Sequence, residues 1–340
     1  MDYDRAGTPP QFQSPSYEPR PKTSIWRILS SVMLVMSILA NGFLLLAIIA
    51  MGAVMTSSTS SESLMEKTLV SGSRHQKIAA IRIEGIIDSR MSDWVSRQLE
   101  AAGSDPSVQG IIVRIISPGG GVSSSDQIHY AISRYKERTG QPVLAFMQSM
   151  AASGGYYAAV ACDEIMAEPT VITGSIGVMM NHWVVKELLQ EKLGITPVVL
   201  KSGERKDWPS MFSDTTDEQK LYLNERLVQP AYERFVQLVT DGRKDKLSEQ
   251  EVRRLADGGI YTAPEALTCK LIDQIGYFEQ AVKTISERAN VSGPTVVEYS
   301  EKFSMLSVLG AEAKTGLTID AELFDKLLTP QLMYLWDGRR

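Results

Sequence analysis

The amino-acid sequence predicts an α/β fold preceded by one N-terminal transmembrane helix. An uncharged, apolar run lies before residue 56, and β-rich runs alternate with segments of helical periodicity after residue 76. With 340 residues, 44% of them hydrophobic, the chain can form one large domain or two smaller ones. Its net charge of -5 provides no basic surface for nucleic acid, so no nucleic-acid partner is expected.

The transmembrane helix is predicted over residues 25–55. No charged residue occurs from residue 28 to residue 61, and the apolar part exceeds the about 20 residues that a helix needs to cross a bilayer. A cleaved signal peptide is the alternative, but such peptides have apolar cores of roughly 7–15 residues near the N-terminus. This run is longer and starts later, so we expect a single-pass anchor in the cell (inner) membrane.

The charges around this helix predict its orientation. Residues 1–24 are rich in Pro, Gln and Ser, which is typical of a disordered tail. Arg20, Lys22 and Arg27 precede the apolar run, whereas the next cation after it is Lys67. By the positive-inside rule, we expect the tail to be cytoplasmic and the rest of the chain to be extracytoplasmic.

Changes in the hydrophobic periodicity divide the remaining chain into three segments. Residues 56–76 are interpreted as a linker, 77–290 as one folded domain and 291–340 as a C-terminal tail of open role. Within the tail, residues 296–299 are expected to form an edge strand. Residues 321–335 are amphipathic and could cover a groove, pack on a neighbour or rest on the membrane surface. In the folded domain the pattern predicts strands at 77–83, 110–116, 143–146, 164–167 and 196–200, and helices at 91–102, 122–135, 153–161, 184–193, 214–240, 248–256 and from 262.

A serine lies in a turn of small residues, Ala-Ala-Ser153-Gly-Gly, after a predicted strand. Such a turn can place a nucleophile at a helix N-terminus, where free N–H groups favour negative charge. The alternative is that Ser153 is an ordinary N-cap. A second glycine turn, 117–121, also follows a strand, and turns at the carboxyl ends of strands converge in open α/β folds. Backbone N–H groups there suit an oxyanion hole better than a phosphate cradle, because the Lys-Ser/Thr ending of a P-loop is missing.

A nucleophilic serine needs a base. His75, His129 and His182 are scattered, and no nearby acidic residue suggests itself to orient His182, so a Ser-His-Asp triad is disfavoured. Lysine is the other candidate, provided that desolvation lowers its pKa. Lys201 and Lys206 both lie in one loop, where lysines are usually solvated.

The chain has two cysteines, Cys162 and Cys269. Two cysteines cannot form a disulfide framework, and the histidines show no metal-ligand spacing. We expect buried free thiols, with a disulfide between them as the alternative if the domain is extracytoplasmic. No metal and no cofactor are expected.

Four motifs occur in order after the apolar run: Ser-Pro-Gly-Gly-Gly-Val (117–122), Met-Ala-Ala-Ser-Gly-Gly-Tyr-Tyr (150–157), Thr-Gly-Ser-Ile-Gly-Val-Met (173–179) and Lys-Ser-Gly-x-x-Lys-Asp (201–207). Together they resemble the short, single-domain form of the signal peptide peptidase A family. The resemblance covers about residues 78–290. It implies a Clp/crotonase-like fold of repeated ββα units and catalysis by a Ser-Lys dyad.

The resemblance also implies a role for each matching residue. It assigns the nucleophile to Ser153 and the general base to Lys206, the second lysine of its motif. Ser175 is implied to hold the lysine amine, and Gly120 and Gly154 are implied to donate N–H groups to the oxyanion. A hydroxyl suits a neutral amine, because a neighbouring carboxylate would raise the pKa of the lysine.

The sequence departs from the family pattern at a few positions. Ile116 stands where family members commonly have Asn, which removes a polar side chain beside the oxyanion turn. Arg205 and Trp208 beside the lysine are also less usual and could alter the cleft. The serine, the lysine and the glycines themselves match the pattern.

The resemblance implies a membrane-anchored serine endopeptidase that degrades hydrophobic, extended peptides such as cleaved signal peptides. It further implies a homo-oligomeric ring in which serine and lysine come from adjacent subunits. One alternative is a crotonase-type acyl-CoA enzyme, which an extracytoplasmic location without CoA disfavours. Another is a catalytically silent membrane scaffold of the same fold that binds peptides.

Overall fold

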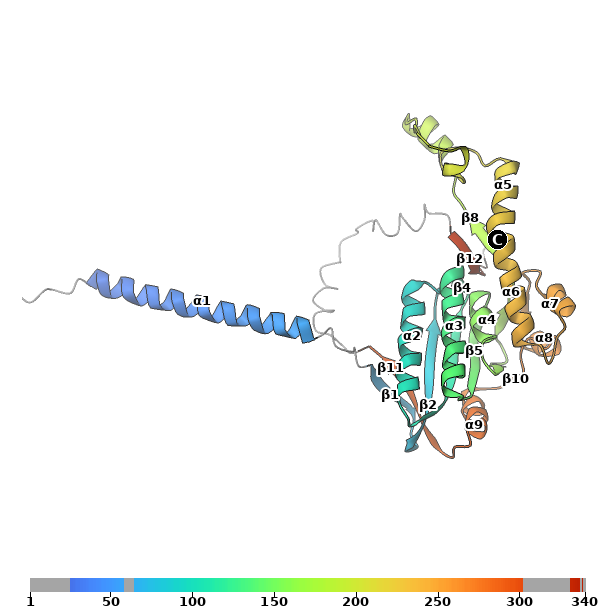
Figure 1. The fold of residues 1–340 in the computed structure, drawn as a ribbon, viewed down its shortest axis with the longest axis horizontal. Coiled ribbons are helices and arrows are strands. Elements are labelled where there is room, and N and C mark those ends of the chain that lie inside the picture. The colour runs from blue at the N-terminus through green and yellow to red at the C-terminus, as the bar shows by residue number, and fades with distance from the viewer. Residues whose placement is uncertain (1–24, 58–63, 302–330, 337, 339–340) are drawn as a thin grey trace, which may run out of the picture. The chain divides into compact units, whose positions relative to one another are not determined.

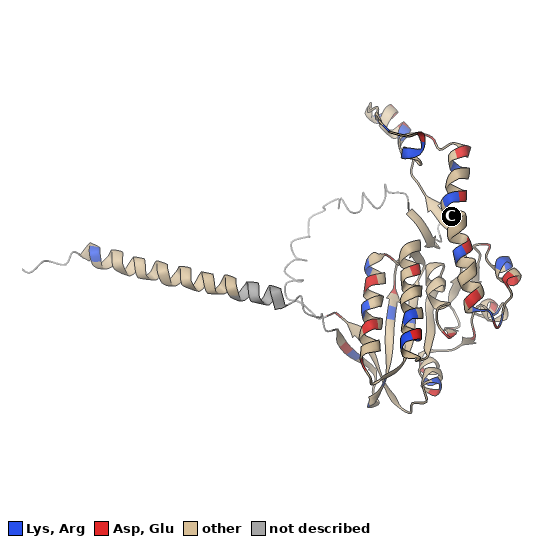
Figure 2. Ribbon diagram, in the orientation of Figure 1, with Lys and Arg blue, Asp and Glu red and all other residues tan. Residues whose placement is uncertain are grey.

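The computed structural model describes residues 25–57, 64–301, 331–336 and 338, and the chain divides into two compact units, 1–62 and 63–340. The described part of the first unit is helix α1 (Ile25–Ser57). Its stretch Ile25–Ile49 is long and apolar enough to cross a membrane. Figure 2 shows a single cationic band near its start, at Arg27. The apolar side chains of this stretch are exposed, which is unfavourable in water and favourable in lipid.

The second unit is built on a nine-stranded sheet with the order β1-β11-β2-β3-β5-β6-β10, while β7 pairs with β5 and β9 with β7. The strands from β11 to β10 run parallel to their neighbours, whereas β1 and β9 are antiparallel. The bounds are β1 (Met65–Val70), β2 (Ser73–Glu84), β3 (Val108–Ser117), β5 (Val143–Ala152), β6 (Glu164–Ala167), β7 (Ile172–Gly174), β9 (Ile260–Thr262), β10 (Gln274–Ile275) and β11 (Pro294–Ser300).

Helices cover both faces of this sheet, and α2 and α3 lie side by side on one of them (Figure 1). Along β2, Ala79 and Ile81 belong to the core under these helices, whereas Ile78 and Ala80 pack in a second core with α9. Successive side chains of a strand point to opposite faces, so a sheet covered on both faces reads as a continuous apolar run. The helices are α2 (Ser89–Ser104), α3 (Val122–Thr139), α4 (Gly154–Ala159), α5 (Asp217–Leu223), α6 (Gln229–Gly242), α7 (Glu249–Leu255), α8 (Ala263–Thr268) and α9 (Phe278–Arg288). The predicted α/β class is confirmed.

Strand β5 changes its partner halfway. It pairs with β6 up to Met147 and with β7 from Met150 onward. Between them Ser149 has a φ of 50°, and the register with β3 shifts at the same place. A bulge of this kind bends a strand. It directs the end of β5 and the turn at Ser153 away from β6 and toward β7.

A second, three-stranded sheet consists of β4 (Gly119–Gly121), β12 (Gln331–Leu335) and β8 (Met179–Asn181), with β12 in the middle and antiparallel to both neighbours. The N–H of Trp336 extends the pairing by donating to the carbonyl of Pro118 at 2.9 Å. Of the amphipathic segment 321–335, residues 331–335 thus form the middle strand of this sheet. Residues 321–330 lie outside the described residues.

The predicted strand at 196–200 is wrong. Residues 194–200 have no regular structure, and Val198 and Leu200 are 82% and 94% exposed. A β-rich composition forms a strand only where a neighbour can pair with it, and no such strand is present in the described part of one copy. The single helix expected at 214–240 is α5 and α6 joined by a π-helical turn, 224–228, and residues 188–192 are π-helical as well.

The structure also differs from the expected boundaries. The expected linker, 56–76, contains β1 and the start of β2. The expected edge strand at 296–299 lies inside the sheet, because β11 has β1 on one side and β2 on the other. Strand β1 has a largely exposed, polar sequence, Met-Glu-Lys-Thr-Leu-Val, without clear apolar alternation. The tail beyond residue 290 therefore supplies strands to both sheets.

A buried ion pair connects the end of α6 to the start of β10. Arg243 is 3% exposed and donates to Asp273 at 2.7 and 2.9 Å and to the carbonyl of Lys270. Asp273 also accepts the N–H of Ile165 at 2.8 Å. Burial by itself would raise the pKa of Asp273, but the hydrogen bonds from Arg243 and Lys246 outweigh it and lower this pKa below its ordinary value.

Replacing Asp273 by Asn should lower the free energy of unfolding by about 3 kcal/mol, because the buried charge of Arg243 loses its counter-charge. Urea denaturation of the full chain in detergent measures the change. Asp217→Asn is the matched control, since Asp217 pairs with Lys220 on the surface and is 98% exposed; its effect should stay below about 1 kcal/mol. Equal midpoints for the two variants would contradict the prediction.

Candidate active site

Ser153 joins the end of β5 to the start of α4 in a strained conformation. Its φ is 52° and its ψ is -114°, and it is 1% exposed. Its N–H donates to the carbonyl of Gly174 and its own carbonyl accepts the N–H of Tyr157, each at 2.8 Å. A positive φ at a non-glycine residue has to be held by its surroundings and is common at functional sites. The side chain makes no capping hydrogen bond, so Ser153 is not an ordinary N-cap.

The two predicted glycine turns meet at this serine. A Cβ added to Gly154 would lie 2.5 Å from Ser125 Oγ and 3.1 Å from the backbone nitrogen of Gly120. A Cβ added to Gly120 would lie 2.1 Å from the carbonyl oxygen of Ile87. Gly120 therefore has to be glycine because of the backbone of Ile87, and Gly154 because of Ser125 and the adjoining backbone of β4.

Two of the three glycine N–H groups in β4 donate to groups outside β12. The N–H of Gly119 donates to Ser117 Oγ at 3.0 Å, and that of Gly121 donates to Ile87 at 2.9 Å. Successive N–H groups of a strand point to opposite sides. The N–H of Gly120 therefore points away from Ile87, toward the side where Tyr334 is its partner in the register of β12.

The carbonyl of Tyr334 lies where the two turns meet. A Cβ on Gly119 would be 2.0 Å from the Tyr334 carbonyl oxygen and 2.7 Å from the backbone nitrogen of Gly154. The Tyr334 oxygen and the Gly154 N–H thus border one point, next to the N–H of Gly120. Backbone donors around one oxygen are the arrangement that stabilises an oxyanion.

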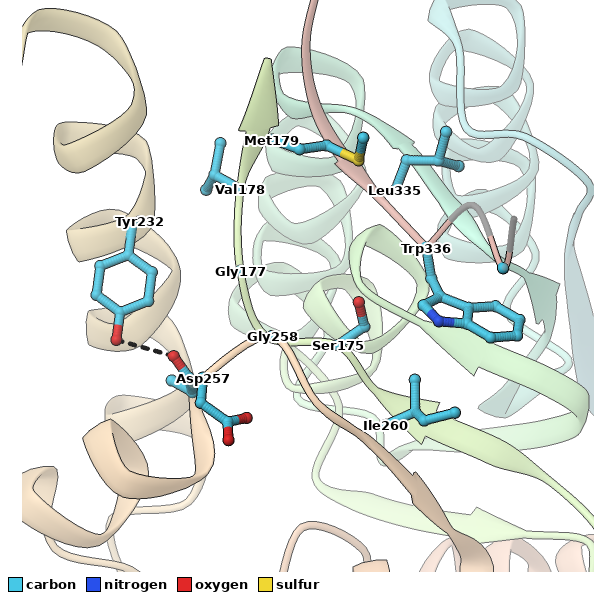
Figure 3. A pocket seen from close by; sticks show the side chains of 12 residues that line it. Ser175, Gly177, Val178, Met179, Tyr232, Asp257, Gly258, Ile260, Leu335 and Trp336 are labelled. Atoms are coloured by element: carbon cyan, nitrogen blue, oxygen red, sulfur yellow. Dashed lines mark hydrogen bonds between the residues drawn. The ribbon is translucent and has the colours of Figure 1, made fainter. Parts of the chain in front are cut away.

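Ser175 directly follows β7, the strand that pairs with the end of β5. It is 7% exposed, has a φ of 49°, and donates its N–H to the carbonyl of Gly259 at 2.7 Å. The residue before it, Gly174, is opposite Ala152, so Ser153 and Ser175 leave neighbouring strands side by side. Ser175 lines a cavity of about 780 Å³ together with Met179 and Trp336 (Figure 3).

Lys206 is not brought to this serine in a single copy. It is exposed, on the 3-10 turn Glu204–Asp207, in the segment that extends from the domain between β8 and α5 (Figure 1). No hydrogen bond or ion pair joins it to Ser153 among the described residues. The structure therefore groups Ser153, Ser175, Gly120 and Gly154 and leaves Lys206 apart.

The turn that carries Lys206 is held by its neighbours. The amine of Lys201 pairs with Asp207 at 2.8 Å and donates to the carbonyl of Glu204 at 3.0 Å. The guanidinium of Arg205 lies 5.5 Å from the ring centre of Trp208 and 4.8 Å from that of Tyr222 on α5. The two less usual residues, Arg205 and Trp208, thus attach the turn to α5. Of the two lysines in this loop, Lys201 forms an ion pair within the turn, whereas the amine of Lys206 has no ion pair among the described residues.

The other candidate groups do not join the site. His129 packs edge-on against Tyr157 at 5.6 Å, and burial lowers its pKa to about 4. None of the three histidines hydrogen-bonds to Ser153 in the described part of the chain. Cys162 is buried and Cys269 half-buried, and both are free thiols. Burial raises the pKa of the Cys162 thiol.

An aromatic cluster beside the serine was not predicted. The ring of Tyr334 is fully buried and stacks on Tyr157 at 4.8 Å, and Phe235 of α6 lies 4.9 Å from both rings. The sequence signal was the tyrosine pair that follows the Ser-Gly-Gly turn, of which Tyr157 faces this cluster. Its partners come from residues far along the chain, which no local pattern indicates.

Residues 135–292 match the family described as Peptidase family S49. A candidate signal peptide peptidase SppA of Enterococcus faecium is 32% identical over 301 residues, which are 82% of this chain and 86% of that protein. A candidate protease of Methanocaldococcus jannaschii is 34% identical over 220 residues, which are 64% of this chain and 68% of that protein. Among solved structures, a ClpP1 mutant of Listeria monocytogenes has a TM-score of 0.40 and a sequence identity of 17% to this chain. The comparison covers 60% of this chain and 94% of the ClpP1 chain.

These sequence matches place the α/β domain among the peptidases. The chain belongs to peptidase family S49, with relatives of the signal peptide peptidase A type. The resemblance stated from the four motifs and the predicted fold class are thereby confirmed.

The glycine contact can be tested by a matched pair. Gly120→Ala should lower the free energy of unfolding by about 2 kcal/mol or more and abolish peptidase activity, because its Cβ collides with the backbone of Ile87. Gly121→Ala should keep both the stability and the activity, since its Cβ would be 3.7 Å from Ser124 Oγ, an ordinary van der Waals distance. Denaturation curves and peptide hydrolysis measure the two effects. Similar losses in both variants would contradict the assignment.

Proposed function

We propose that this chain is a membrane-anchored serine endopeptidase that degrades hydrophobic, extended peptides such as cleaved signal peptides, using Ser153 and Lys206 as a dyad. One observation carries the proposal. The strained turn of Ser153 is packed against β4 so that the backbone nitrogen of Gly154 and the carbonyl oxygen of Tyr334, the register partner of Gly120, both lie beside Gly119. Membership of a peptidase family supports the reaction class.

The chemistry follows from these groups. Ser153 Oγ attacks the scissile carbonyl while Lys206 Nζ, in its neutral form, accepts the hydroxyl proton. The N–H groups of Gly120 and Gly154 stabilise the tetrahedral oxyanion. The protonated lysine then returns the proton to the leaving amine, and water, activated by the same lysine, hydrolyses the acyl-enzyme. Ser175 accepts a hydrogen bond from the lysine amine or donates one to it, which holds the amine without favouring its charge.

The lysine is proposed to come from a neighbouring copy of the chain in a ring. Lys206 lies on an exposed segment, whereas Ser153 is buried in the body of the domain. The same segment exposes large apolar side chains that a second copy would cover. They include Trp183 at 61%, Val198 at 82% and Leu200 at 94% exposure.

The pairing of β4 and β8 with one strand between them supports the proposal that the substrate is extended. In the structure an antiparallel strand, β12, pairs with both of its edges. A peptide that adds itself as a strand is recognised by main-chain hydrogen bonds, and its alternate side chains enter pockets. We propose that substrates bind in this way.

Helix α1 is proposed to anchor the enzyme. Its apolar stretch is long enough to span a bilayer, and Arg27 lies at its start. With the cationic N-terminal side in the cytoplasm, the peptidase domain would be extracytoplasmic. A membrane location would bring the site close to hydrophobic peptides that are released into the bilayer.

A fluorophosphonate probe, which labels activated serines, tests the dyad. The full chain in detergent should be labelled, whereas Ser153→Ala and Lys206→Ala should lose labelling, because the first lacks the nucleophile and the second its base. Lys201→Ala keeps the base and should retain more labelling than Lys206→Ala. The matched control is Lys283→Ala, on the surface of α9, which should keep full labelling. Labelling of Lys206→Ala at the wild-type rate would remove the proposed base, and an unlabelled but folded wild-type chain would favour the silent scaffold.

Co-expression of the two inactive variants tests the sharing of sites. If the serine and the lysine come from different copies, mixed oligomers should regain labelling at about a quarter of the sites, because half of the copies supply each group. The same two variants purified separately should remain unlabelled. No recovery in mixed oligomers would show that both groups act within one copy.

A further inference from the structure

We propose that Asp257 is a positioning residue of this peptidase, which acts by holding Ser175 in the backbone conformation that receives the lysine amine. The inference rests on the proposed function and adds a residue to its site. Asp257 begins the loop Asp-Gly-Gly, residues 257–259, between α7 and β9. This Asp-Gly-Gly loop lies outside the four motifs from which the site was predicted.

Ser175 needs support from outside its own strand. It directly follows β7, so it has left the strand pairing, and its φ is 49°. A positive φ is unfavourable for serine and persists only where the surroundings hold it. The direction of the Ser175 hydroxyl depends on this conformation. Whatever holds the backbone here therefore also sets the partner of the lysine amine.

The Asp-Gly-Gly loop supplies this support by two hydrogen bonds. The N–H of Ser175 donates to the carbonyl of Gly259 at 2.7 Å, and the N–H of Gly258 donates to the carbonyl of Ile176 at 3.2 Å. Both bonds lie just beyond the last residue pair of β7 and β9, which is Gly174 with Ile260. The loop thus extends the contact between these strands to the serine and the residue after it.

The carboxylate of Asp257 gives the loop its shape. Its Oδ1 accepts the N–H of Gly259 at 2.8 Å, which closes a turn of the type that Asp and Asn side chains form with the backbone two residues later. Gly258, between them, has a φ of 83° that glycine adopts without strain. Gly259 is therefore bound at its N–H by Asp257 and at its carbonyl by Ser175.

The start of the loop is attached to the body of the domain. Ala256 is 3% exposed, and its carbonyl accepts the hydroxyl of Tyr232 in α6 at 2.9 Å, the bond drawn dashed in Figure 3. Asp257 follows this fixed point directly. A continuous series of hydrogen bonds therefore leads from α6 through the loop to Ser175.

Asp257 contributes a hydrogen-bond acceptor and not its charge. The side chain is exposed, and its carboxylate points away from the hydroxyl of Ser175 (Figure 3). A carboxylate that faced the amine would favour the charged form of the lysine and oppose its action as a base. An amide oxygen can accept the same N–H, so Asn should replace Asp257 whereas Ala should not.

The activity test measures labelling by the fluorophosphonate probe with the full chain in detergent. Asp257→Ala should lower the labelling rate at saturating probe, kinact, about tenfold, because the lysine amine loses its oriented partner. The probe concentration at half-saturation, KI, should stay within about twofold, since Ser153 itself is unchanged. Asp257→Asn should recover kinact to within about twofold of the wild type. Its mass is checked before use, because an Asn-Gly pair can deamidate.

Asp105→Ala is the matched control. Asp105 Oδ1 accepts the N–H of Ser107 at 2.8 Å in the same kind of turn, before the start of β3 and so at the opposite end of this strand from the active site. Its loss should lower the stability without changing kinact. Equal losses of kinact in Asp257→Ala and Asp105→Ala, or in Asp257→Ala and Asp257→Asn, would overturn the positioning role.

Hydrogen–deuterium exchange tests the support of Ser175 directly. In Asp257→Ala the amide of Ser175 should exchange faster, because its acceptor Gly259 is no longer held, whereas Asp257→Asn and Asp105→Ala should match the wild type. Mass spectrometry of peptides that cover residues 173–177 measures the change. An unchanged exchange in Asp257→Ala would overturn the proposal.

The two proposals fail in distinguishable ways. A wild-type chain that is labelled, together with an unchanged kinact in Asp257→Ala, would leave the peptidase standing and overturn the role of Asp257. An unlabelled wild-type chain in which Asp257→Ala still loosens the Ser175 amide would overturn the dyad and leave the support of Ser175 standing.

Discussion

The close approach of two backbones is the constraint on which the rest of the site depends. Strand β4 packs so closely on the first turn of α4 that a Cβ on Gly119 would lie 2.7 Å from the backbone nitrogen of Gly154. This approach brings the Gly154 nitrogen beside β4, next to the strained φ of Ser153. Ser153 is held in this conformation by two hydrogen bonds, from its own N–H to the carbonyl of Gly174 and from the N–H of Tyr157 to its carbonyl. Rigid backbone elements therefore position the donors, which makes the geometry independent of side-chain rotamers.

The parallel sheet explains why distant motifs meet. Strands β3, β5 and β7 all end at the same edge, so the turns that follow them converge. The bulge at Ser149 then moves the end of β5 from β6 to β7, which places Ser153 next to Ser175. A straight β5 would have left these two serines on strands that do not touch.

Much of this could be predicted from local sequence. The apolar runs, the glycine turns and the order of strands are short-range signals, and they located Ser153 and the two glycine turns after predicted strands. Ser175 was assigned only through the family resemblance, because no strand was predicted before it. The position of the Lys206 segment, between β8 and α5, could not be predicted from the sequence. Its large apolar side chains are exposed in a single copy, so they do not indicate where the segment packs. The same reason explains the wrong strand at 196–200, whose composition suits pairing but whose neighbour is missing from the described chain. Strand β12 could not be foreseen either, since its pairing depends on residues far away in sequence.

Strands β4 and β8 do not pair with each other, and each needs a neighbouring strand for its backbone groups. Two short strand edges with unpaired backbone groups attract an additional strand, because unpaired polar groups are costly when water is excluded. The chain meets this need with β12, whose tyrosine joins the aromatic cluster. Backbone pairing fixes the position of β12, while the ring of Tyr334 attaches it to the domain through Tyr157 and Phe235. The C-terminal strand is therefore held both by its main chain and by one aromatic side chain.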